Sequence, residues 1–226
     1  MATSATIVLL GKIGQLGWEL HRDLQPLGRV VALDFPQIDF SRPDELLSMV
    51  ESLQPALIVN AVAYTNVDKA ESEPELCDQI NSRTVERLAQ QAARLRCGLI
   101  HISTDYVFDG FQSRPYTEED PTHPLNRYGS SKLAGEQAVL AHAPACWVLR
   151  TAWLYSRRAN DFVQRVLTWS RQQETLKIVD DQVGSPTWAR LLSQMISLAL
   201  AQAKGDYFNY IRDTHGIPHM AGGGAV

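Results

Sequence analysis

The chain has 226 residues, of which 45% are hydrophobic and 20% charged, as in an ordinary globular protein. The net charge of −4 argues against a nucleic-acid-binding protein, because such proteins usually carry a basic surface. Cys77, Cys97 and Cys146 lie far apart without metal-ligand spacing, so we expect reduced thiols, no metal site and a cytoplasmic location. The apolar run at residues 7–10 is too short for a signal peptide, and no run reaches membrane-spanning length, so we expect no membrane partner.

The first segment predicts a strand, a glycine-rich turn and a helix. Residues 5–10 form a continuous apolar run, typical of a strand buried on both faces of a parallel sheet. Gly11, Gly14 and Gly17 follow at once, ahead of a helix expected at residues 18–27. Glycines between a strand and a helix let backbone N–H groups approach a pyrophosphate at the helix N-terminus. The pattern therefore favours a dinucleotide site, with a tight turn packed by glycines as the alternative.

Asp34 closes the second predicted strand, residues 30–33. It lies about 20 residues beyond the glycines, where an acidic side chain can bind the adenosine ribose hydroxyls. This position favours NADH, whereas Arg29 and Arg42 are available for the 2′-phosphate of NADPH. The sequence leaves the choice between the two cofactors open.

The rest of the chain continues to alternate between strand and helix patterns. Further strands are expected at residues 57–61, 98–103, 146–150, 176–179 and 207–210, and helices at 74–96, 128–141, 161–173 and 188–203. This order predicts a Rossmann-type, doubly wound α/β fold with all strand carboxyl ends at one edge of a parallel sheet. We assign residues 1–150 to an NAD(P)-binding domain and residues 151–226 to a small, incomplete substrate-binding part interleaved with the last sheet elements.

Tyr128 and Lys132 lie four residues apart on a predicted helix, so their side chains share one face. A lysine ammonium beside a tyrosine favours the phenolate and lowers the phenol pKa from its usual value of about 10. Such a pair can donate or accept a proton near neutral pH. Thr104 ends the preceding strand and is expected to converge with Tyr128. An amphipathic helix that carries both residues by chance is the alternative explanation.

Several blocks of the sequence, taken together, resemble the extended short-chain dehydrogenase/reductase family, and within it the dTDP-4-dehydrorhamnose reductases. The blocks are residues 11–20, 59–71, 103–108, 124–129 and 150–153. The resemblance is expected to run from residue 5 to near residue 210 and to fade beyond it. Relatives continue for several dozen residues that complete the substrate domain, so we expect a complete cofactor half and a shortened substrate half.

The resemblance implies reduction of the C4 keto group of a dTDP-4-keto-6-deoxyhexose, dTDP-4-dehydro-L-rhamnose, with NADPH or NADH as hydride donor. Tyr128 would protonate the developing alkoxide, Lys132 would bind the nicotinamide ribose, and Thr104 would bind the reacting oxygen. Asp105 and Trp153 would contact the sugar. The implied cofactor contacts are Gly11, Lys12, Ile13, Gly14, Gln15, Leu16, Gly17, Asp34, Asp39, Phe40, Ala61, Ala63, Tyr64, Thr65, Tyr128 and Lys132.

Two other functions stay open at the level of the sequence. One is a non-catalytic nucleotide-binding protein of the same fold, similar to the regulatory subunit of methionine adenosyltransferase. The other is a related sugar-nucleotide reductase or epimerase, since a fold does not set its substrate. Thr104, Asp105 and Trp153 favour the reductase, and the shortened C-terminus favours the binding protein. A monomer and a homodimer are both compatible with the sequence.

Overall fold

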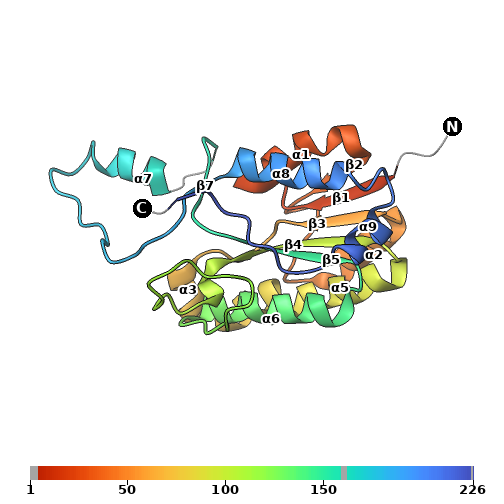
Figure 1. The fold of residues 1–226 in the computed structure, drawn as a ribbon, viewed down its shortest axis with the longest axis horizontal. Coiled ribbons are helices and arrows are strands. Elements are labelled where there is room, and N and C mark those ends of the chain that lie inside the picture. The colour runs from red at the N-terminus through yellow and green to blue at the C-terminus, as the bar shows by residue number, and fades with distance from the viewer. Residues whose placement is uncertain (1–4, 159–161, 225) are drawn as a thin grey trace.

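The computed structural model describes residues 5–158, 162–224 and 226, which form a parallel sheet between two layers of helices (Figure 1). The main sheet contains β1 (Thr6–Leu10), β2 (Arg29–Leu33), β3 (Leu57–Asn60), β4 (Gly98–Thr104) and β5 (Cys146–Thr151). A second, two-stranded sheet pairs β6 (Leu154–Tyr155) with β7 (Thr187–Trp188). The strand order of the main sheet is β2-β1-β3-β4-β5, and every neighbouring pair is parallel. The predicted doubly wound fold is therefore confirmed.

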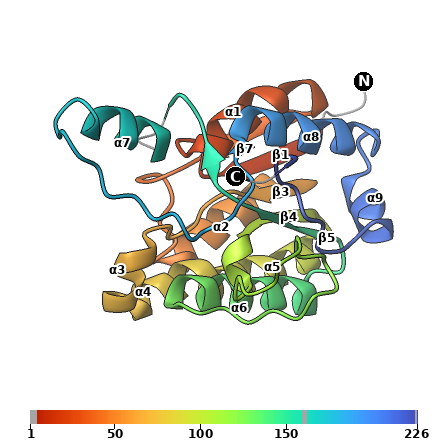
Figure 2. The same cartoon turned by 60° about the vertical axis from the view of Figure 1, so that its left-hand side comes forward.

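The helices cover both faces of this sheet (Figures 1 and 2). They are α1 (Gln15–Asp23), α2 (Pro43–Leu53), α3 (Val67–Ser72), α4 (Pro74–Asp78), α5 (Thr84–Leu95), α6 (Arg127–His142), α7 (Phe162–Trp169), α8 (Ala189–Ala201) and α9 (Tyr207–Asp213). Two short 3-10 helices, η1 (Gln25–Leu27) and η3 (Asp105–Val107), and a π-helical turn, η2 (Gln79–Arg83), complete the helical elements that the structure describes. No helix among the described residues is long and apolar enough to span a bilayer.

The core divides into two layers because the strands bury both of their faces. In β1, Val8 and Leu10 join the layer under α2, α5 and α6, whereas Ile7 and Leu9 join the layer under α1, α8 and α9. Successive side chains of a strand point to opposite faces, so a strand covered on both sides must be apolar throughout. This requirement explains the continuous apolar run at the start of the chain.

Helices α1 and α8 lie side by side on one face of the sheet, although the chain separates them widely (Figure 1). The Ser193 hydroxyl donates to a carboxylate oxygen of Asp23 at 2.7 Å, and the Ser197 hydroxyl donates to the Asp23 carbonyl at 2.7 Å. Glu19 accepts a hydrogen bond from Arg190 at 3.2 Å. The helix that follows the glycine loop is thus held by residues near the end of the chain.

The segment after α9 returns along the outer side of β5. The Val148 amide donates to the Gly216 carbonyl at 2.9 Å, and the Met220 amide donates to the Arg150 carbonyl at 2.8 Å. Parallel bridges link Trp147 with Gly216 and Arg150 with residue 219. This extended segment covers the free edge that β5 would otherwise expose.

Three sequence predictions need correction. Residues 207–210 form the start of α9 rather than a strand, because Asp206 caps the helix by accepting a hydrogen bond from the Asn209 amide. Residues 176–179 form no strand, and Val179 is 70% exposed. The long helix expected at 74–96 is divided into α4, the π-helical turn η2 and α5, and η2 packs against α6.

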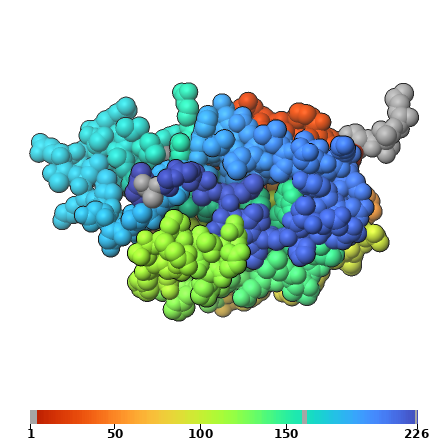
Figure 3. Space-filling model, viewed as in Figure 1, coloured from red at the N-terminus to blue at the C-terminus, as the bar shows by residue number. Residues whose placement is uncertain are grey.

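Helix α7 stands apart from the body of the molecule, as Figure 3 shows for the cyan segment that contains it. None of its described residues is buried, and its apolar residues Phe162, Val163 and Leu167 are about half exposed. The predicted helix began at residue 161, which lies outside the described residues. The helix prediction is otherwise confirmed, with the C-terminal end at Trp169 instead of residue 173.

Candidate active site

Most of the predicted site residues lie at one edge of the sheet, where the carboxyl ends of the parallel strands meet. Gly11 follows β1, Ala61 follows β3, and Thr104 ends β4. The strand order reverses between β1 and β3, which are direct neighbours. In doubly wound sheets, a ligand crevice forms outside such a reversal point.

The glycine loop passes through space that no side chain could share. Gly11 has a φ of +91°, and a Cβ atom there would lie 3.0 Å from the Ala61 backbone. A Cβ atom on Gly17 would lie only 1.8 Å from the Gly11 carbonyl oxygen. Helix α1 begins at Gln15, Gly14 offers no side-chain cap, and the first turn holds no acidic residue. The positive end of this helix is therefore open to an anion such as a pyrophosphate.

Asp34 shapes the glycine loop directly. One carboxylate oxygen accepts a hydrogen bond from the Ile13 amide at 2.7 Å, and the other accepts one from the Phe35 amide at 2.8 Å. Lys12 turns outward and donates to Gln37 at 2.8 Å. Asp34 thus holds the loop in shape, while its predicted contact with the cofactor ribose stays a prediction.

The remaining loop residues differ in what they offer to a ligand. Ile13 is 67% exposed, whereas Leu16 is buried in the core. The Gln15 side-chain amide donates to the Leu154 carbonyl at 3.3 Å, and its buried oxygen has no hydrogen-bond partner among the described residues. Gln15 is therefore the member of this group with a free polar atom at the site.

Asp39 and Phe40 lie in the loop after β2, and both already make contacts within the protein. One carboxylate oxygen of Asp39 accepts from both the amide and the hydroxyl of Ser41, at 2.8 and 2.6 Å. The Phe40 side chain is buried in the core, and its carbonyl accepts from Thr84 at 2.6 Å. A cofactor contact of Phe40 would have to use its backbone, because the ring is enclosed.

The segment after β3 is held in place by Asn81 from the π-helical turn. The Tyr64 amide donates to Asn81 at 2.8 Å, and the Asn81 side chain donates back to the Tyr64 carbonyl at 3.1 Å. The Tyr64 hydroxyl donates to Glu73 at 2.7 Å. Ala63 is partly exposed and Thr65 is exposed, so this rigid segment presents small side chains at the site edge.

Thr104 and Tyr128 converge, as the sequence predicts. Burial raises the pKa of Tyr128 to about 12, and a side-chain hydrogen bond with Thr104 acts in the opposite direction. The Thr104 hydroxyl also donates to Asp105 at 3.0 Å. The pKa of Asp105 is raised by its burial, with the Thr104 hydrogen bond acting against the shift. A phenol and a hydroxyl therefore meet at the carboxyl end of β4.

Lys132 behaves differently from the sequence prediction. Its amine donates to the Ile102 carbonyl at 2.7 Å and lies 3.3 Å from Nε2 of His101. The pKa of Tyr128 is raised instead of lowered, and Lys132 is not among the groups that shift it. The prediction of a lysine-lowered tyrosine pKa is thus wrong for the cofactor-free protein, because the amine is turned toward β4. Burial lowers the pKa of Lys132 itself to about 8.

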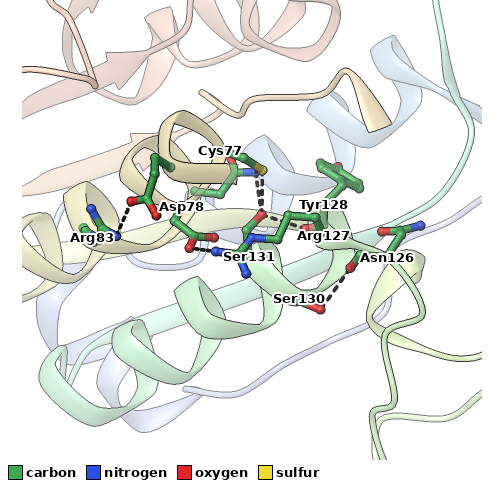
Figure 4. Close-up of polar contacts among 10 residues, drawn as sticks. Cys77, Asp78, Arg83, Asn126, Arg127, Tyr128, Ser130 and Ser131 are labelled. Atoms are coloured by element: carbon green, nitrogen blue, oxygen red, sulfur yellow. Dashed lines mark hydrogen bonds and ion pairs between the residues drawn. The ribbon is translucent and has the colours of Figure 1, made fainter. Parts of the chain in front are cut away.

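Helix α6 can approach η2 because Gly135 has no side chain. A Cβ atom there would lie 2.2 Å from the Asn81 carbonyl oxygen. Ser131 accepts a hydrogen bond from Asn81 at 2.9 Å and lies 3.1 Å from the Cys77 sulfur. Figure 4 shows Cys77 facing Ser131, with Tyr128 on the same helix. These buried polar contacts fix the helix that carries Tyr128 and Lys132.

Trp153 lies just beyond β5 and is 39% exposed. Its ring covers Gly184, where a Cβ atom would lie 2.4 Å from the indole. The Trp153 carbonyl accepts a hydrogen bond from the Thr187 amide at 3.1 Å. The residue thus joins the end of the main sheet to the loop before β7, with part of its ring open to solvent.

Three buried residues of this region escaped the sequence analysis. Asn81 holds the Tyr64 backbone, Asn60 lies 3.1 Å from His101, and His101 faces Lys132. For Asn60 and His101 the available signal was a polar residue inside a buried apolar strand pattern, whereas Asn81 lies in η2 and gave no such signal. Among the residues that the structure describes, no three His, Cys, Asp or Glu side chains gather as a metal site would require.

Comparison with known proteins places this geometry in a family. The family model described as the RmlD substrate binding domain matches residues 5–226, so the likeness does not fade near residue 210 as expected. The dTDP-4-dehydrorhamnose reductase of Salmonella typhimurium is 41% identical over 224 residues, covering 97% of this chain and 73% of the relative. The corresponding reductase of Burkholderia thailandensis is 42% identical over 223 residues, covering 96% of this chain and 73% of the relative.

The fold of a solved relative agrees with these matches. The crystal structure of dTDP-4-dehydrorhamnose reductase from Bacillus anthracis, in complex with NADP, has a TM-score of 0.89 to this chain at 31% identity. It covers 100% of this chain, which in turn covers 77% of that protein.

Proposed function

The chain belongs to the RmlD substrate binding domain family, and from this membership we propose that it reduces dTDP-4-dehydro-L-rhamnose to dTDP-L-rhamnose. The hydride comes from NADPH or NADH, and it is added at C4 of the sugar. The observation that carries the proposal is the meeting of Thr104 and Tyr128 at the sheet edge that also carries the glycine loop, where we infer that a dinucleotide binds. The substrate is a dTDP-linked keto sugar.

The residues present suit a nicotinamide dinucleotide. The close approach of Gly17 to Gly11 leaves no space for a side chain, and the uncapped N-terminus of α1 offers its N–H groups to an anion. When bound, the cofactor supplies the hydride, which protein side chains cannot provide. Asp34, the loop from Gly11 to Gly17, and the segment from Ala61 to Thr65 are the residues proposed to hold it.

Tyr128 is the proposed proton donor. Its pKa of about 12 keeps the phenol protonated at neutral pH, so the proton is in place when the keto oxygen becomes negatively charged. Thr104 shares a hydrogen bond with this phenol, and we infer that its hydroxyl donates to the same oxygen once it turns away from Asp105. We infer that Lys132 orients the nicotinamide ribose once its amine leaves the Ile102 carbonyl.

The segment beyond β5 is the proposed sugar side of the site. Asp105 and Trp153 are assigned to contacts with the sugar, and residues 151–226 contribute the substrate-binding part, against residues 1–150 for the cofactor. The described cysteines are free and buried, which fits a reducing, cytoplasmic compartment. A monomer and a homodimer both remain compatible with this proposal.

Oxidation of NADPH and NADH, followed by absorbance with enzymatically prepared dTDP-4-keto sugar, tests the function. We expect turnover in the wild type and a loss of about 10²–10⁴-fold in kcat for Tyr128→Phe, as for removal of a general acid. Cofactor affinity, measured by quenching of tryptophan fluorescence, should stay nearly intact in this variant. Cofactor binding without turnover in the wild type would instead support the non-catalytic nucleotide-binding protein.

Tyr210→Phe is the matched control for this substitution. Tyr210 lies on α9, which packs near Gly98 at the opposite end of β4 from Thr104. The same loss of a phenolic hydroxyl there should leave kcat unaffected. Equal losses in the two variants would remove Tyr128 from the role of proton donor.

A further inference from the structure

A chain of buried polar groups runs from the end of β3 to Lys132. The Asn60 side-chain oxygen accepts from the Val62 amide at 3.1 Å, and the Asn60 nitrogen lies 3.1 Å from Nδ1 of His101. Nε2 of the same ring lies 3.3 Å from the Lys132 amine. Asn60 and His101 are fully buried, and Lys132 is 1% exposed. These three side chains are shielded from solvent, so they satisfy their hydrogen bonds within the protein.

The direction of each hydrogen bond follows from one fixed donor. A backbone N–H can only donate, so the atom of Asn60 that faces Val62 must be the oxygen. The Asn60 NH₂ group then faces His101 and donates to Nδ1. Burial holds the pKa of His101 well below its ordinary value, so the ring is neutral and carries one proton. That proton must lie on Nε2, the atom that faces Lys132.

The Nε2–H group favours one charge state of the lysine. A neutral amine has a lone pair that accepts from Nε2–H, while it donates to the Ile102 carbonyl. An ammonium has no lone pair, so its protons would face the proton of His101. Satisfying the ammonium would require the other tautomer of the ring, which would oppose the NH₂ group of Asn60.

Other groups near Lys132 act in the opposite direction. Glu136 on α6 and Cys77 on α4 both raise the lysine pKa, whereas burial is the larger effect and lowers it. The Glu136 carboxylate is itself paired with Arg150 from β5, at 2.7 Å. His101 from β4 is the neighbour whose hydrogen bond distinguishes the neutral amine from the charged one.

We propose that His101, oriented by Asn60, is a positioning residue that holds the Lys132 amine against β4 and favours its neutral form. This inference rests on the proposed function, in which the lysine orients the cofactor ribose. Because His101 is fully buried, we assign it no contact with cofactor or substrate and a role through the lysine alone. In the reductase it would set the alkaline limit of activity, because the charged amine is lost as the pH rises through the lysine pKa.

The histidine tautomer can be observed in the cofactor-free wild-type protein. The chain has six histidines, and ¹⁵N NMR of their ring nitrogens distinguishes the Nε2–H from the Nδ1–H tautomer. Loss of one signal in His101→Gln assigns the residue. We expect Nε2–H at neutral pH. An Nδ1–H ring would overturn the proposal, since it would present an acceptor to the ammonium.

The lysine can be titrated without cofactor or substrate. The chain has five lysines, so ¹³C labelling gives five ε-methylene signals, with Lys132→Arg as the assignment variant. In His101→Gln, the flexible amide can turn its oxygen toward the ammonium. We expect the Lys132 midpoint to rise by about one pH unit, or about tenfold in its dissociation constant, equivalent to one hydrogen bond.

Ser103→Ala serves as the matched control, because Ser103 lies on the same strand two residues further along and is also buried. It should leave the Lys132 midpoint in place. A midpoint that is equal in His101→Gln and Ser103→Ala would overturn the proposal. If His101→Gln fails to fold, His101→Asn takes its place for both the signal assignment and the lysine titration.

These NMR results do not depend on turnover. A raised lysine midpoint in a protein without reductase activity would sustain the role of His101 and reject the proposed function. In an active protein, the alkaline limb of kcat/KM should move upward with the lysine midpoint in His101→Gln. An unmoved limb would overturn the role of His101 in setting the alkaline limit.

Discussion

Replacing Glu136 by alanine should lower the free energy of unfolding by about 3–5 kcal/mol, because a buried charge would lose its partner. The Glu136 and Arg150 side chains are only 1% and 5% exposed. Nε and Nη2 of Arg150 donate to the carboxylate at 3.0 and 2.7 Å. Nη1 of Arg150 already has no hydrogen-bond partner among the described residues, so the variant would leave the guanidinium without the side-chain hydrogen bonds that the carboxylate provides.

Urea unfolding, followed by tryptophan fluorescence, measures this loss. With a slope of about 2 kcal/mol per molar urea, the midpoint should fall by about 2 M. The exposed pair of Arg83 and Glu75 provides the control, because its partners are 55% and 81% exposed. Glu75→Ala should leave the midpoint unchanged, since exposed ion pairs contribute little.

A double-mutant cycle separates the missing partner from the missing side chain. Glu136→Leu and Arg150→Met should each be strongly destabilising, whereas the double variant should lose much less than their sum, because neither charge remains. Single losses below about 1 kcal/mol, or effects that add within about 0.5 kcal/mol in the double variant, would refute the reasoning.

Two further outcomes are expected. Gly17→Ala should weaken NADPH binding at least tenfold in a fluorescence titration, because its Cβ would lie 1.8 Å from the Gly11 carbonyl oxygen. Gly223→Ala is the control, because a Cβ atom there would lie in open space. Equal NADPH affinities in the two variants would contradict the described loop. Burial raises the pKa of Cys97 to about 12 and that of Cys146 to about 11, so both thiols stay protonated at pH 8. They should react with a chromogenic disulfide only on unfolding, and rapid reaction in the native protein would argue against their burial.

The main sheet could be predicted from the sequence because each of its strands is marked by a short apolar run. The apolar run before Gly11 needs cover on both faces, and the glycines after it allow the sharp turn into α1, so strand, loop and helix followed from one short stretch. The predicted strand at residues 207–210 failed because aromatic residues suit a strand, while the Asp206 cap and packing against β4 select a helix. Such tertiary contacts leave no periodic signal.

The residues of the site could be predicted from the sequence, but the pKa shifts of Tyr128 and Lys132 could not. Thr104 and Tyr128 meet because a strand end and the following helix share an edge, which topology alone requires. The orientation of Lys132 depends on His101, a single polar residue within a buried strand. The spacing correctly placed Lys132 on the same face of α6 as Tyr128. The contacts of its amine with β4 depend on burial, which a sequence pattern does not reveal.

The pairing of α1 with α8 has a consequence for synthesis. Asp23 receives hydrogen bonds from Ser193 and Ser197, 170 and 174 residues later in the chain. At about 5–20 residues per second, a ribosome takes roughly 10–30 s to make the intervening segment. Until then, the apolar surface of β1 and α1 that α8 later covers is open to chaperones. The dinucleotide end of the protein is therefore synthesised first but is among the last parts to be completed.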